Sequence, residues 1–165
     1  MKKIILLFSA LVCVTFTYSQ NCNLLLEGET DKMTGKYEIF TKNPIKVFTS
    51  SDYGISIKLA RYSDRHIFSF YIYGASHCVD DKGKILVLFR DGQRSEMVNM
   101  SGFNCDNYSS VHFSLDVLNH PYYQEFATKE IEAIRVWTYK GYVQVDLNST
   151  QSKQVMQLFQ CMQSM

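Results

Sequence analysis

The sequence predicts an α+β fold, in which an antiparallel, meander-rich β-sheet, curved or sandwich-like, is joined by a short helix near residues 119–130 and a C-terminal helix near 149–163. Three observations lead to this class. Residues 131–147 and residues 53–73 alternate between apolar and polar side chains around a turn, which indicates two antiparallel hairpins. Residues 149–163 repeat apolar side chains at helical spacing. Such an order is typical of α+β domains, and a helix-free sandwich is the alternative if the last helix is shorter.

The segment 131–147, IEAIRVWTYKGYVQVDL, is the most regular hairpin. We place its turn at Lys140-Gly141, because glycine accepts the positive φ that a tight turn needs. Pairing outward from this turn puts Val136 opposite Val145, on an aliphatic face that should pack in the core. The opposite face carries aromatic and charged side chains, with Arg135 opposite Asp146: Trp137, Tyr139, Tyr142, Arg135 and Asp146.

Residues 23–118, before the short helix and this hairpin, contain a series of predicted short strands. Two apolar pieces on either side of a turn-like DKMTG predict a first hairpin over residues 23–42. Pro44 then interrupts the pairing, because proline lacks the backbone donor of a strand. Ile45–Phe48 is therefore a candidate edge strand.

The second hairpin, residues 53–73, should turn at Ser63-Asp64. His66 lies beside this turn, so we expect its side chain to be in solvent. The turn aligns apolar residues on one face in three pairs: Ile55 with Ile72, Ile57 with Phe70 and Leu59 with Phe68.

The third hairpin has a strong turn signal at Asp91-Gly92. Its first strand, ILVLF over residues 85–89, is apolar at every position, which indicates a central strand covered on both faces. Its second strand should span residues 94–100. Residues 111–118 alternate as a further half-buried strand does.

Two capping signals define the predicted helices. Asn119 can cap the short helix, with Pro121 in the first turn, where proline is tolerated. Asn148, followed three residues later by Gln151, can cap the C-terminal helix. That helix carries one apolar stripe for packing on the sheet: Val155, Leu158, Phe159 and Met162.

Residues 1–19 have the features of an export signal: two lysines, an apolar run from Ile4 to Phe16, and small residues at Thr17 and Ser19. The run is shorter than the roughly 20 apolar residues of a membrane span. We therefore expect a signal peptide over residues 1–19, a single exported β-rich domain over residues 20–165, and a secreted or periplasmic location.

The charge of the chain is balanced. The signal contains two of the 17 basic residues and none of the 16 acidic ones, so the mature chain carries a formal charge of −1. This balance, without a basic stripe, argues against nucleic acid as a partner. No later apolar run approaches the length of a membrane helix, so no span is expected once the signal is removed.

Four cysteines remain after removal of the signal, an even number in a chain sent to a compartment where disulfides persist. They allow three pairings. In an up-and-down meander, the strands that end before Cys78 and Cys105 run in the same direction, so both cysteines reach one end of the sheet. We therefore predict a Cys78–Cys105 disulfide, which leaves Cys22 for Cys161.

No catalytic constellation, metal site or cofactor motif is predicted. The densest group of polar side chains, His77, Asp80 and Asp81 beside Cys78, lacks the ligand spacing of known metal motifs. A polar turn is the simpler interpretation of this segment. The competing interpretation is an extracellular or periplasmic hydrolase that uses His77, Asp80 or Asp81.

The aromatic face of residues 131–147 is the most suggestive surface, because exposed rings can stack on sugars or anchor a protein. We expect a small, exported, disulfide-stabilised, non-catalytic domain that binds an unknown extracellular protein or carbohydrate. Its expected binding residues are Trp137, Tyr139, Tyr142, Arg135 and Asp146. Two alternatives stay open. The C-terminal helix or the N-terminal segment could cover this face as a second core, or the protein could be a structural component of an envelope assembly.

Overall fold

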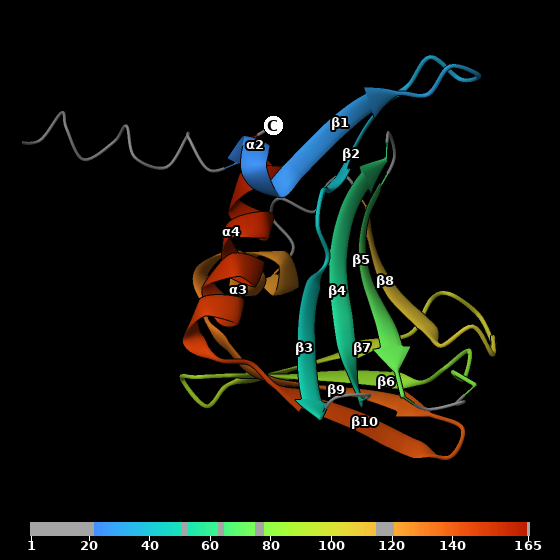
Figure 1. Ribbon diagram of the computed structural model, residues 1–165, viewed down its shortest axis with the longest axis vertical. Helices are drawn as coiled ribbons and strands as arrows, with labels where there is room; N and C mark the ends of the chain where they lie inside the picture. The colour runs from blue at the N-terminus through green and yellow to red at the C-terminus, as the bar shows by residue number, and fades with distance from the viewer. Residues whose placement is uncertain (1–21, 51–52, 63–64, 75–77, 115–120, 165) are drawn as a thin grey trace, which may run out of the picture.

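Figure 1 shows the computed structural model of the chain, which describes residues 22–50, 53–62, 65–74, 78–114 and 121–164. The predicted signal, residues 1–19, lies outside the described residues. The elements, in chain order, are α2 (Cys22–Leu25), β1 (Leu26–Thr30), β2 (Tyr37–Thr41), β3 (Ile45–Ser50), β4 (Tyr53–Tyr62), β5 (Arg65–Tyr73), β6 (Lys84–Phe89), β7 (Arg94–Val98), β8 (Tyr108–Ser114), α3 (Pro121–Thr128), β9 (Ile131–Thr138), β10 (Gly141–Asp146) and α4 (Ser149–Ser164).

The described strands form two antiparallel sheets. One has six strands in the order β1-β2-β4-β5-β8, with β3 also paired to β4, and the other has four in the order β10-β9-β6-β7. The strands of one sheet run across those of the other, and α3 and α4 lie together at one side of the sheets (Figure 1). The predicted α+β class is therefore confirmed, in its sandwich-like form.

The strands β2 and β3 lie one after the other along the same edge of β4. Between them, the buried Thr41 hydroxyl donates to the Leu59 carbonyl at 2.8 Å and accepts from the Leu59 N–H at 2.8 Å. A side chain thus satisfies the backbone of Leu59 at the one point of this edge of β4 that lies between its pairing with β2 and its pairing with β3.

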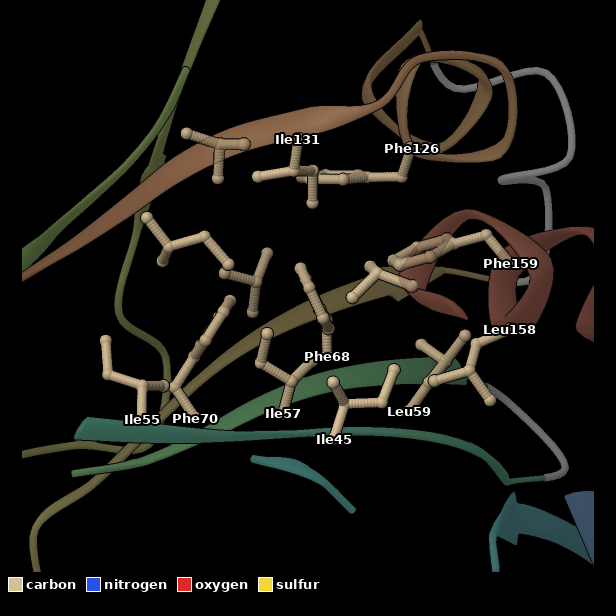
Figure 2. Close-up of a cluster of buried hydrophobic side chains, with 14 of the residues drawn as sticks. Ile45, Ile55, Ile57, Leu59, Phe68, Phe70, Phe126, Ile131, Leu158 and Phe159 are labelled. Carbon is tan, nitrogen blue, oxygen red and sulfur yellow. The ribbon is translucent and has the colours of Figure 1, made fainter. Parts of the chain in front are cut away.

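Apolar side chains from both sheets and from the two helices meet in one buried cluster (Figure 2). The ring of Phe68, on β5, lies 5.1 Å from the ring of Phe126 on α3 and 5.0 Å from the ring of Phe159 on α4, measured between centroids. All three rings are fully buried. Sheet and helices are therefore joined through aromatic edge-to-face contacts at one point of the core.

The C-terminal helix begins where the sequence predicts. The Gln151 N–H donates to Asn148 Oδ1 at 2.9 Å, and the Asn148 N–H donates to Gln151 Oε1 at 3.0 Å, which is a reciprocal capping box. The four residues of the predicted stripe are all buried. The short helix begins at Pro121 and ends at Thr128, while its predicted cap, Asn119, lies outside the described residues.

The earlier hairpins agree with prediction in most respects. The first pairs β1 with β2, and the second has the three predicted apolar pairs, although its turn at Ser63-Asp64 lies outside the described residues. Gly92, with φ 82°, lies in the turn of the third. Its first strand, β6, is central, but Leu86 and Leu88 are only half-buried, so the outer face of the strand is partly covered rather than fully covered.

The hairpin of residues 131–147 has the predicted faces but a different register. Its strands are joined by Tyr139-Lys140, so Val136 lies opposite Val143 instead of Val145. The prediction was wrong because a shift of two residues returns every side chain to the same face, and the alternation that identifies a strand does not distinguish the two registers.

Both predicted disulfides are present, Cys78–Cys105 and Cys22–Cys161. The first pair does not form across one meander as predicted, because β5 and β7 belong to different sheets. Cys78 follows β5 and Cys105 precedes β8, and these two strands pair with each other. The Cys78–Cys105 bond therefore closes the segment in which the chain leaves the six-stranded sheet, forms β6 and β7 in the other sheet, and returns to β8. The Cys22–Cys161 bond joins α2 to α4.

A buried asparagine supports the same junction between the sheets. Asn99 Nδ2 donates to the Asp80 carbonyl at 2.7 Å. Its Oδ1 accepts from the Ser101 N–H, the Ser109 hydroxyl and the Ser110 N–H, each at 3.1 Å. Both ends of the amide are satisfied, so this polar group links the loop after β7 to the turn before β6 and to β8 without an unpaired buried atom.

His66 is buried, contrary to the solvent position expected from the sequence. Its side chain is 4% exposed, and Nδ1 lies 3.2 Å from the hydroxyl of Tyr123. The Tyr123 hydroxyl donates to the Phe159 carbonyl at 3.4 Å, which leaves its oxygen to accept from His66 Nδ1 in the neutral imidazole. Burial, followed by the positive charge of Arg61, lowers the pKa of His66 from 6.5 to about 4.

We expect the free energy of unfolding to fall as the pH decreases from about 6.5 to about 4. In this range His66 binds a proton in the unfolded chain but not in the folded one, so protonation favours unfolding. Protonation of His66 is expected to lower the free energy of unfolding by about 2 kcal/mol, which is less than the value that corresponds to the full pKa shift. Urea titrations between pH 7.5 and pH 4.5 measure it. His66→Gln, which does not titrate, should flatten this dependence, and an equal slope in that variant would contradict the assignment.

Candidate functional site

The predicted binding residues lie on the outer face of the four-stranded sheet. We call this surface the Trp137 face and define it as Trp137, Tyr139, Tyr142, Arg135 and Asp146. The strands β9 and β10 position four of these side chains, because alternate residues of the strands point into the core and leave these four on the other side, and Tyr139 lies in the turn between the strands. Trp137 lies directly opposite Tyr142, with ring centroids 5.8 Å apart.

Arg135 is the centre of this surface. Its guanidinium carbon lies 4.2 Å from the ring centroid of Tyr142 and 5.5 Å from that of Trp137, within the range of cation–π attraction. Its Nε and Nη2 donate to Gln144 Oε1 at 3.0 and 2.6 Å. Stacking and forked hydrogen bonding together hold the guanidinium in one orientation.

Asp146 is part of the same row, but not as the direct partner of Arg135 that the sequence predicted. Arg135 is opposite Gln144, and Asp146 is opposite Ala133. The amide of Gln144 connects the two charged residues, since its Nε2 donates to Asp146 Oδ1 at 3.3 Å. The two-residue change of register is the physical reason for this difference.

The Trp137 face is not the interior of a second core within the described part of the chain. Tyr139 is 78% exposed and Tyr142 is 53% exposed, whereas Trp137 is half-buried. The helices α3 and α4 lie on the core side of the sheets, away from this surface (Figure 1). The structure thus leaves two phenol rings accessible beside an indole that is partly protected by its neighbours.

The hydrolase alternative has less structural support than the Trp137 face. Cys78 is bonded to Cys105 and has no free thiol, and Asp80 and Asp81 are exposed at a turn. His77 lies outside the described residues. Among the residues that are described, no group of three or more His, Cys, Asp or Glu side chains could hold a metal ion.

A second surface feature was not predicted. The outer face of the six-stranded sheet contains a hollow of about 260 Å³ lined in part by Tyr62, Tyr71, Tyr108 and Lys58. These residues come from three strands, β4, β5 and β8, whose pairing is not visible in a single stretch of sequence. Each of these strands contributes one of the three tyrosines, so no single stretch of sequence contains the set.

Within the described ranges, none of the helices has the length and apolar character that crossing a membrane requires. Comparison of the chain with protein-family models, with curated proteins and with solved structures found no match in any of the three.

Proposed function

We propose that this chain is a small exported domain that binds an extracellular protein through the Trp137 face and performs no catalysis. Two disulfides support export, because such bonds persist in oxidising compartments, and the N-terminal apolar run of residues 4–16 supports it independently. Secretion and release into the periplasm are equally compatible with these features.

The observation that carries the proposal is the position of Arg135 against Trp137 and Tyr142. Tryptophan, tyrosine and arginine are the residue types most enriched at the energetic centres of protein interfaces. Here the guanidinium is already held by two rings and by Gln144, so it loses little conformational freedom when a partner arrives. Tyr139, at the tip of the hairpin, extends the surface.

A protein partner fits this surface better than a sugar polymer does. The charged groups close to the rings have both signs, with Arg135 and Asp146 joined through Gln144, and Lys84 paired with Glu96 at 2.8 Å across the neighbouring strands. Mixed charges around an aromatic centre favour orientation of a partner with complementary charges. Stacking of a carbohydrate on Tyr139 or Tyr142 is the alternative that the experiment distinguishes.

Trp137→Ala should weaken partner binding at least tenfold while the domain stays folded, because the indole contributes contact area and holds Arg135. Arg135→Lys should also weaken binding, since an ammonium keeps the charge but loses the planar contacts. Immobilised wild-type and variant proteins are compared for retention of extracellular proteins. A retained protein is then purified and titrated while the fluorescence of Trp137, the one tryptophan of the chain, is recorded.

Tyr37→Ala is the matched control, because Tyr37 is 57% exposed on β2 and lies outside the Trp137 face. A protein that binds wild type and Tyr37→Ala but neither face variant supports the proposal. Equal binding by Trp137→Ala, with an unchanged circular dichroism spectrum, contradicts it, and unfolding of that variant would assign the indole to the core. Retention of a polysaccharide that is lost in Trp137→Ala would favour the carbohydrate alternative at this face, and a homo-oligomer in solution would favour an envelope assembly.

A further inference from the structure

The hollow on the six-stranded sheet arises from the sizes of its side chains. Ala60 on β4 lies opposite Ile67 on β5, and Ser69 lies opposite Lys58, so two of the four positions at the floor are small. Larger side chains surround this floor: Phe40, Tyr62, Tyr71 and Tyr108. The result is a depression on the outer face of the sheet, not a gap in the core. The helices α3 and α4 lie on the other side of this sheet (Figure 1).

Hydroxyl groups and aromatic rings form the wall at one end of the hollow. The rings of Tyr71 and Tyr108 lie 4.8 Å apart, and the Tyr108 hydroxyl is 3.0 Å from the Ser69 hydroxyl. Burial, followed by neighbouring phenols, raises the pKa of Tyr71, and burial, followed by the charge of Glu38, raises that of Tyr62. Both phenols therefore stay neutral at physiological pH and can donate as well as accept hydrogen bonds.

Lys58 is the one charged side chain among the residues that line the hollow. Its ammonium lies 5.4 Å from the ring centroid of Tyr71. In the described part of the chain no carboxylate is within salt-bridge distance of this ammonium. A half-buried cation without an acidic partner favours a ligand that supplies one negative charge.

The volume limits the ligand to a small ring. Pockets for drug-sized ligands measure roughly 300–1,000 Å³, and this hollow, at about 260 Å³, is below that range. An aromatic wall suits the apolar face of a pyranose, and the phenol and serine hydroxyls suit its hydroxyl groups.

We propose that the hollow binds one ring of an acidic saccharide of the uronic acid class, with its carboxylate on Lys58 and its ring against Tyr71 and Tyr108. This site is on the opposite sheet from the Trp137 face and does not depend on a protein partner there. The neutral phenols hydrogen-bond the ring hydroxyls, and the ammonium selects the acidic sugar over the neutral one.

The test is a titration of the oxidised, mature protein with glucuronic acid, glucose and acetate, followed by NMR of the tyrosine ring protons. Glucuronic acid should saturate in the millimolar range and shift the rings of Tyr71 and Tyr108, glucose should bind at least tenfold more weakly, and acetate should not saturate. Lys58→Gln should reduce the affinity for glucuronic acid about tenfold and leave that for glucose unchanged. Tyr71→Ala should weaken both sugars.

Lys46→Gln is the control, because Lys46 is an exposed lysine on the neighbouring strand β3 and does not line the hollow. It should bind glucuronic acid as the wild type does. Equal affinity for glucose and glucuronic acid, equal losses in Lys46→Gln and Lys58→Gln, or no saturable binding of glucuronic acid would each overturn the proposal. Trp137→Ala should keep full sugar binding, so the result is independent of the outcome at the Trp137 face.

Discussion

Replacing Cys22 and Cys161 together with alanine is expected to lower the free energy of unfolding by about 3–5 kcal/mol. The bond closes a loop of 139 residues, so its removal returns much conformational freedom to the unfolded chain. Its loss also weakens the folded state locally. Of the five residues of β1 only Leu26 is buried, so little else fixes this edge strand once α2 is released from α4. Urea unfolding under oxidising conditions measures the change.

The matched comparison is Cys78→Ala with Cys105→Ala, which opens a loop of 27 residues. In the chain-entropy account this pair contributes about 1.5 kcal/mol less than the longer loop. Hydrogen exchange separates the local effect, because amides of β1 should lose protection in the Cys22/Cys161 variant and keep it in the other. A larger loss of stability in the Cys78/Cys105 variant would contradict the dominant role of loop length.

The parts of the fold that depend on residues close together in the sequence could be predicted from it. Alternation over residues 53–62 and 65–73 identifies which side chains enter the core, and the capping box of Asn148 and Gln151 marks the start of α4, because both signals lie within a few residues. The division into two sheets could not be predicted in this way. Whether β6 continues beside β5 or leaves for a second sheet depends on contacts with β9, far along the chain.

The two candidate sites also differ in whether their residues are close together in the sequence. The grouping of the Trp137 face could be predicted because one hairpin provides all five side chains, although the change of register altered which of them lie opposite each other. The hollow needs β4, β5 and β8 side by side, so no single segment indicates it. His66 was misplaced for a related reason, because α3 returns to cover the strand beside its turn and brings Tyr123 to the imidazole.

Phe159→Ala is expected to destabilise the protein by about 3–5 kcal/mol, the range observed for deletion of a buried aromatic ring. The Phe159 ring is fully buried and stacks on Phe126 at 4.9 Å between centroids, while its contacts with Phe68 and Tyr123, at 5.0 and 4.9 Å, are edge-to-face. Its removal therefore leaves a cavity where β5, α3 and α4 meet. Thermal and urea unfolding measure the loss, and Met33→Ala, at a residue 94% exposed, should change stability by less than about 0.5 kcal/mol.

A double-mutant cycle tests whether this ring joins the helices to the sheet. Phe68→Ala and Phe159→Ala remove opposite sides of one contact, so the double variant should lose less stability than the two single variants together, by about 0.5–3 kcal/mol. Strict additivity would mean that α4 and β5 are stabilised independently of each other. Phe159→Leu fills most of the space, and its cost, expected to be below about 1.5 kcal/mol, separates loss of volume from loss of the aromatic contacts.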